Sequence, residues 1–144
     1  MKRRVAVVGI TALFILQALA GAAQAQERYK VRLATVPMDG GLRNTVAGSG
    51  SATAVLTGTK LTVTGTFDGL LSPATTARVH RGAAMGVRGS SFAELTVSKA
   101  PKGTISGSID LTPERAQALK KGQLYIQISS EKAPEGTLWG WILK

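Results

Sequence analysis

The sequence predicts an all-β fold: a single antiparallel β-sandwich, of Greek-key or immunoglobulin-like type, with one short α-helix near the C-terminus. Three observations support this prediction. Apolar and polar residues alternate over short stretches through most of the chain, as in strands with one face on a core. Glycine, proline and other turn residues separate these stretches at regular intervals. Only residues 112–121 interrupt the alternation, and they carry a helical pattern.

The first 25 residues have the pattern of a secretory signal peptide. A basic start precedes an apolar run, and the small-x-small cleavage signal Ala23-Gln24-Ala25 follows. The alternative is a membrane anchor, but the apolar run is short for a span and the cleavage signal follows it at once. We therefore expect a bacterial protein exported by a Sec-type signal, periplasmic or secreted, with one domain over residues 26–144. We expect no transmembrane span after cleavage.

The chain is strongly basic, with 18 Lys and Arg residues against eight Asp and Glu residues and a formal net charge of +10. The predicted signal peptide holds three of the basic residues and none of the acidic ones, which leaves +7 on residues 26–144. Positive charge is compatible with nucleic acid, but export, few aromatic residues and the lack of a nucleic-acid motif argue against it. We expect a protein or an anionic envelope component as partner.

The strands follow in order. Tyr29, Val31 and Leu33 alternate with polar and basic residues and predict a first strand with a basic outer face. Residues 52–67 alternate around a turn at Gly58 and predict a hairpin with threonines on its wet face. The next predicted strand ends in a loop of residues 82–89, whose glycines let the backbone turn sharply. Two further strands are expected around residues 93–97 and 105–111.

The predicted helix has signals at both ends. Thr112 is a good N-cap, and Pro113 suits the first helical position because its missing N–H would be unpaired anyway. Gly122 can take the left-handed conformation that ends a helix. With only Ala116 and Leu119 as an apolar stripe, this helix needs the sheet to hold it.

Two strands close the chain. In the first of them, Leu124, Ile126 and Ile128 alternate with Tyr125 and with polar residues. This pattern predicts a strand with one buried face. The last strand, residues 137–143, is apolar on both faces and must be covered on both sides.

Trp139 and Trp141 share one face of this last strand, and Gly140 between them allows another backbone to approach closely. We expect at least one of the two tryptophans to pack in the core. The alternative is an exposed patch that forms an interface with another chain, since tryptophan is favoured in binding hot spots.

Several of these segments together resemble the chordin-type (CHRD) domain family. The stretches Leu61-Thr62-Val63-Thr64-Gly65-Thr66-Phe67-Asp68-Gly69-Leu70 and Gly103-Thr104-Ile105-Ser106-Gly107-Ser108-Ile109-Asp110-Leu111-Thr112 carry most of the similarity, with Pro134, Gly136, Leu138 and Gly140 in the closing segment. The resemblance implies an immunoglobulin-like or Greek-key β fold outside the cytoplasm, as in bacterial exported members. In animal members it implies a place within growth-factor-binding proteins.

The resemblance also bears on metal binding. Many members carry His-x-His-Gly where this chain has Arg78, His80 and Gly82, and a histidine where it has Ser129. Three imidazoles on neighbouring strands suit zinc or copper, but His80 is the only histidine here and two arginines flank it. We therefore expect no metal site and no cofactor.

No catalytic set assembles from the sequence. It has no cysteine, no Gly-x-Ser-x-Gly and no second histidine, and its best acid pair, Glu131 and Glu135, has the character of solvated loop charges. We expect a non-catalytic binding or accessory module that acts through protein–protein or envelope-surface contacts; the alternative is a metal-binding or hydrolytic periplasmic enzyme. The candidate partner-binding residues are Arg78, His80, Arg81, Arg88, Trp139 and Trp141.

Overall fold

The computed structural model describes residues 25–38 and 40–144, in which eight strands and one α-helix form. The predicted signal peptide lies, apart from its last residue, outside the described residues. The elements are β1 (Gln26–Thr35), β2 (Ser49–Thr57), β3 (Lys60–Asp68), β4 (Ala74–Arg81), β5 (Ser90–Val97), β6 (Gly103–Asp110), α1 (Pro113–Lys120), β7 (Leu124–Ser130) and β8 (Leu138–Leu143).

The strands form one closed antiparallel barrel, in the order β1-β2-β3-β6-β5-β4-β7-β8, and the predicted β-sandwich is wrong. The decisive contact is between the first and last strands, where Val31 pairs with Ile142 and Ala34 with Trp139. A sandwich and a barrel both alternate inward and outward residues along every strand. The alternation therefore predicted the strands but could not tell which architecture they build.

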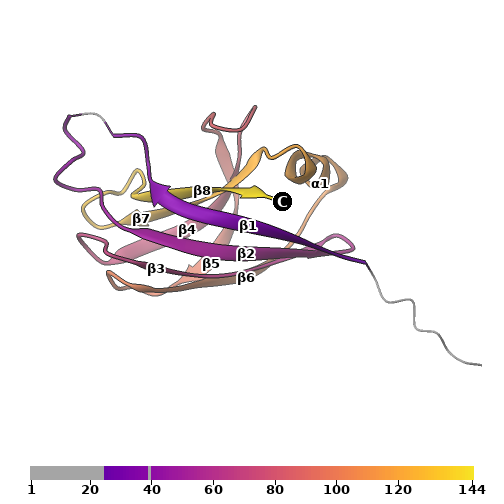
Figure 1. The fold of residues 1–144 in the computed structure, drawn as a ribbon, viewed down its shortest axis with the longest axis horizontal. Helices are drawn as coiled ribbons and strands as arrows, with labels where there is room; N and C mark the ends of the chain where they lie inside the picture. Colours follow the sequence, from indigo (N-terminus) through magenta and orange to yellow (C-terminus); the bar gives the residue numbers. More distant parts are fainter. Residues whose placement is uncertain (1–24, 39) are drawn as a thin grey trace, which may run out of the picture.

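The chain connects these strands by hairpins and two crossovers, one from β3 to β4 and one from β6 through α1 to β7. β4, β5 and β6 follow each other as antiparallel neighbours, and β6 returns to pair with β3, which is a Greek-key order. The predicted hairpin of residues 52–67 is confirmed as β2 and β3, with Thr57 opposite Lys60 and Gly58 at a φ of 63° in the turn. Figure 1 shows the strands wrapped around the interior with α1 near one end, beside the C-terminus.

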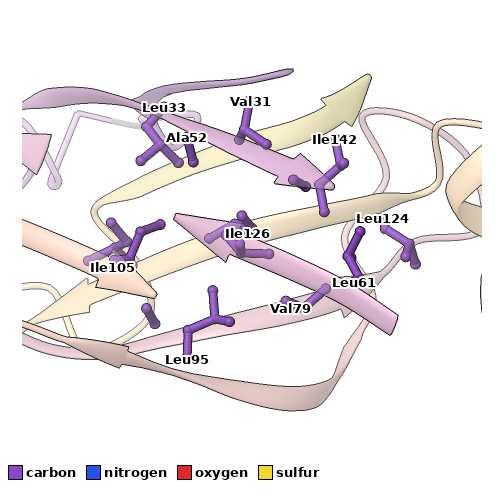
Figure 2. Close-up of a cluster of buried hydrophobic side chains, with 14 of the residues drawn as sticks. Val31, Leu33, Ala52, Leu61, Val79, Leu95, Ile105, Leu124, Ile126 and Ile142 are labelled. Carbon is purple, nitrogen blue, oxygen red and sulfur yellow. The ribbon is translucent and has the colours of Figure 1, made fainter. Parts of the chain in front are cut away.

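The barrel interior is a single apolar core. Every strand contributes inward residues, and Figure 2 shows part of this cluster, including Val31, Leu61, Ile126 and Ile142. Leu124, Ile126 and Ile128 are fully buried, as their alternation predicted. In β8 the inward positions are held by Leu138, Gly140 and Ile142. The interior is therefore filled without either tryptophan.

Helix α1 forms as predicted. The Thr112 side-chain oxygen accepts a hydrogen bond from the Arg115 backbone N–H at 3.3 Å, and Pro113 is the first helical residue. Gly122 follows the helix with a φ of 70°. Ala118 and Leu119 are buried and join the barrel core. Within the part of the chain that the structure describes, no helix is long and apolar enough to cross a membrane.

Candidate functional site

An aromatic cluster lies on the outer surface of the barrel, where β4, β7 and β8 run side by side. The register places His80 opposite Tyr125, and Tyr125 opposite Trp141. Trp139 lies two residues before Trp141, on the same side of β8, and is paired with Gln127. Here the four rings of His80, Tyr125, Trp139 and Trp141 are called the aromatic face.

The rings of the aromatic face touch one another in the geometries that aromatic pairs prefer. His80 stacks on Tyr125 with ring centroids 4.8 Å apart and planes inclined by 17°. The centroids of Tyr125 and Trp141 lie 4.6 Å apart, and Trp139 meets both Tyr125 and Trp141 edge-on at 5.7 Å. Tyr125 is only 1% exposed, whereas both tryptophans are half-buried. The tyrosine is therefore the centre of a second packed layer outside the barrel.

The loop of residues 82–89, between β4 and β5, is tied to this layer through Gly89. The Gly89 N–H donates to the Tyr125 hydroxyl at 3.0 Å, and the hydroxyl donates to the Gly89 carbonyl at 3.1 Å. His80 Nδ1 lies 2.9 Å from the same carbonyl oxygen. Because a carbonyl only accepts, Nδ1 is the donor in this contact. The Gly89 backbone thus holds the loop against two rings.

Gly89 cannot be replaced without moving this loop. A Cβ at this position would lie 1.7 Å from the Arg81 carbonyl oxygen, and one at Gly82 would lie 2.1 Å from the Val87 carbonyl oxygen. Both distances are far below van der Waals contact. The two glycines therefore let the ends of the loop close on each other, which confirms the prediction from the glycine-rich sequence.

The loop presents a cation beside Trp139 and two exposed apolar side chains. The Arg88 guanidinium carbon lies 5.7 Å from the centre of the Trp139 ring, within the range of a cation–π contact. Met85 and Val87 are 60% and 48% exposed, more than most large apolar side chains in the described chain. Figure 1 shows this loop projecting from the barrel near the end of β4.

Strand β1 adds a second cation next to the aromatic face. Because Val31 pairs with Ile142 and Ala34 with Trp139, the register places Arg32 opposite Trp141. The close approach of the two strands requires Gly140, since a Cβ there would lie 2.5 Å from the Arg32 carbonyl oxygen. The aromatic face thus has Arg32 opposite Trp141 and Arg88 over Trp139.

A small apolar cluster outside the barrel supports Trp139. It consists of Val36, Val46 and Ala133, with Leu42 and Trp139 packed against it. Val36 and Ala133 also line a pocket of about 220 Å³, together with Leu42 and Arg88. The remaining lining residues are Lys132, Pro134, Glu135 and Gly136. We call this the Arg88 pocket.

The structure brings four of the six predicted partner-binding residues together: His80, Arg88, Trp139 and Trp141. Arg78 lies on the same outward side of β4, opposite Gln127, and forms an exposed ion pair with Glu94 at 3.4 Å. Arg81 pairs with the buried Leu124, on the side of β4 that carries the inward-facing Val79, and is exposed at the strand end, so it does not belong to the aromatic face. Neither tryptophan lies in the barrel interior.

Sequence reasoning missed Tyr125 and the apolar half of the pocket. Tyr125 alternates with buried leucine and isoleucine, a pattern that predicts a solvent-facing side chain, whereas the structure buries it. The signal that identifies it is its position on the strand that precedes β8, facing the same way as Trp141. Val36, Leu42 and Ala133 come from loops without a regular pattern, so the sequence carried no comparable signal for them.

The aromatic face offers ring surfaces and a nearby cation for contact with another molecule. Among residues 25–38 and 40–144 no group of three or more His, Cys, Asp and Glu side chains is placed to hold a metal. His80 uses Nδ1 to hold Gly89 and its ring face to pack on Tyr125. Glu131 and Glu135 are both exposed in the loop between β7 and β8. The arrangement of flat rings, flexible apolar side chains and arginines suits the binding of another molecule.

Comparison with known proteins agrees with the resemblance found in the sequence. Neither a curated protein nor a solved structure shows a significant match to the chain. The family model of the CHRD domain, in contrast, matches residues 18–142, which include all eight strands nearly in full, the helix and every ring of the aromatic face. On the strength of this match over most of its length, the chain belongs to the CHRD domain family.

Proposed function

We propose that this chain is a non-catalytic binding module that acts outside the cytoplasm and holds a protein partner on its aromatic face. The observation that supports this proposal most strongly is the placement of Trp139 and Trp141. They lie half-buried on the outer surface, while Leu138 and Ile142 of the same strand fill the interior. Their rings are only half-buried, so part of their apolar surface stays available for contact with another molecule.

The composition of the surface favours a protein partner. Tryptophan, tyrosine and arginine are the residues most enriched in the energetic centres of protein interfaces. Trp139, Trp141 and Arg88 combine two of these types in direct contact, on a base that Tyr125 makes rigid. Rigid aromatic anchors lose little conformational entropy on binding, so more of their contact energy contributes to affinity.

Affinity capture tests the proposal. The tagged protein is incubated with an extract of the producing cell's envelope, and captured proteins are quantified by mass spectrometry for wild type, Trp139→Ala and Trp141→Ala. Thr64→Ala is the matched control, because Thr64 is exposed on β3, across the barrel from β7.

We expect wild type and Thr64→Ala to enrich the same protein, and the tryptophan variants to lose about tenfold or more of it, as for an interface hot spot. Circular dichroism confirms that each variant is folded. Capture that is equal in folded wild type and both tryptophan variants would contradict the proposal. The alternative of a metal-binding or hydrolytic enzyme has no specific observation in its favour among the described residues.

A further inference from the structure

The Arg88 pocket opens beside the aromatic face and has its own character. Val36, Leu42, Ala133 and Pro134 make its wall largely apolar. Trp139 packs against the apolar cluster that includes Val36 and Ala133, so the pocket and the aromatic face share one support. A ligand that covers the tryptophans therefore meets this pocket at its border.

The size of the pocket indicates what it can hold. Its volume of about 220 Å³ is several times the space of one water molecule in the liquid, about 30 Å³. It is below the roughly 300–1,000 Å³ of pockets that enclose whole small-molecule ligands. A pocket of this size suits one large side chain of a larger partner better than a complete small ligand.

The charges around the pocket indicate what accompanies that side chain. Arg88 and Lys132 line it, against the single carboxylate of Glu135. The Lys132 backbone N–H is held by the Ser72 hydroxyl at 2.9 Å, which fixes this loop residue at the pocket. Two cations beside an apolar cavity favour a ligand that presents an apolar group next to negative charge.

We propose that the Arg88 pocket receives an aromatic or large aliphatic side chain of an acidic peptide segment, whose neighbouring carboxylates pair with Arg88 and Lys132. This inference rests on the proposed function and specifies the partner's chemistry. The side chain provides apolar burial in the pocket, and the carboxylates replace water around the two cations. The guanidinium of Arg88, already beside Trp139, connects the pocket to the aromatic face.

The chain contains its own reporter for this binding. Trp139 and Trp141 are its only two tryptophans, so intrinsic tryptophan fluorescence comes from the aromatic face alone. The probe is a capped heptapeptide with a central phenylalanine and two aspartates on each side of it. One matched peptide has alanine in place of phenylalanine, and another has lysines in place of the aspartates.

We expect the phenylalanine peptide to change the fluorescence saturably, and both matched peptides to bind about tenfold or more weakly. The alanine peptide should bind more weakly because it has no ring to bury in the pocket, and the lysine peptide because it cannot form the charge pairs. Arg88→Ala should weaken binding of the phenylalanine peptide by a similar factor. Arg28→Ala, at an exposed arginine on β1, is the matched control and should bind like wild type.

Three results would overturn the inference: no binding of the phenylalanine peptide, equal binding of the alanine peptide, or undiminished binding by folded Arg88→Ala. Vesicles of phosphatidylglycerol serve as a further probe. A fluorescence change that vesicles cause and the peptide does not would assign the site to an anionic membrane surface and also overturn it. Partner capture that requires Trp141 but tolerates Arg88→Ala would leave the proposed function standing and reject only the pocket inference.

Discussion

Replacing Tyr125 by phenylalanine tests how the loop of residues 82–89 is held on the barrel. The change keeps the ring, and with it the stacking on His80 and the contact with Trp141. It removes the hydroxyl, which donates one hydrogen bond to Gly89 and accepts another from it. At about 0.5–1.5 kcal/mol for each bond, the attachment of the loop should weaken by about 1–3 kcal/mol.

Hydrogen exchange of the Gly89 amide measures this loss directly. A decrease of about 1–3 kcal/mol in the local opening free energy corresponds to exchange that is roughly fivefold to 150-fold faster. The Gly89 carbonyl keeps its bond from His80, so we expect the loop to open more often while the ring cluster stays packed. The global free energy of unfolding should fall by no more than the local value.

Tyr29→Phe is the matched control. Tyr29 and Tyr125 are the two tyrosines of the chain, and the Tyr29 hydroxyl donates to the Glu27 carboxylate at 2.6 Å rather than to the loop. It should leave the exchange of Gly89 unchanged. If Tyr125→Phe leaves the Gly89 amide as protected as in wild type, the hydroxyl does not hold the loop. That result would contradict the role of Tyr125 as the residue that holds the loop of residues 82–89 on the barrel.

The remaining predictions concern packing, ionisation and export. Leu138→Ala should cost about 2–5 kcal/mol in urea unfolding because Leu138 is fully buried in the interior, and Trp141→Ala should cost less because its indole is half-buried outside; equal losses would contradict this placement. Burial and the bond to Glu27 raise the pKa of Tyr29 to about 12. The folded protein therefore keeps a proton that the unfolded chain releases near pH 10, and this stabilisation is complete below pH 10 and is lost as the pH rises to about 12. Tyr29→Phe should flatten this part of the curve of unfolding free energy against pH, and an unchanged slope would refute the assignment. Intact mass of the protein recovered from its producing cells should show a chain that begins at or near Gln26, whereas a retained Met1 would reject the predicted export.

The elements that the sequence predicted well are those fixed by neighbouring residues. The β2–β3 hairpin depends on local alternation and on Gly58, and α1 depends on Thr112, Pro113 and Gly122 at its ends. That Trp139 and Trp141 share one face of β8 also follows from the period of a strand, but the period does not tell which face points inward, and the expectation that at least one of them lies in the barrel core is wrong. Each of these signals lies within a few residues, so the chain reveals it without knowledge of the fold.

What the sequence could not predict depends on contacts between distant segments. Closure of the barrel rests on β1 meeting β8, as in the pair Val31 and Ile142, and no local pattern distinguishes that from two facing sheets. The burial of Tyr125 depends on a loop that folds back over it through Gly89. The Arg88 pocket combines residues 36, 42, 88 and 132–136 from different parts of the chain, which the closed barrel brings together.

The most direct test of the binding surface is an NMR titration of the ¹⁵N-labelled protein with the acidic phenylalanine peptide. The chain has two indole N–H groups, those of Trp139 and Trp141, and both lie on the aromatic face. We predict that the chemical shifts of these two indole N–H groups change together with those of the Arg88 and Ala133 amides, with one dissociation constant. The shifts of amides around Thr64 on β3 should not change. Shifts confined to β3 and its neighbours, or indole signals that do not move at saturation, would contradict this prediction.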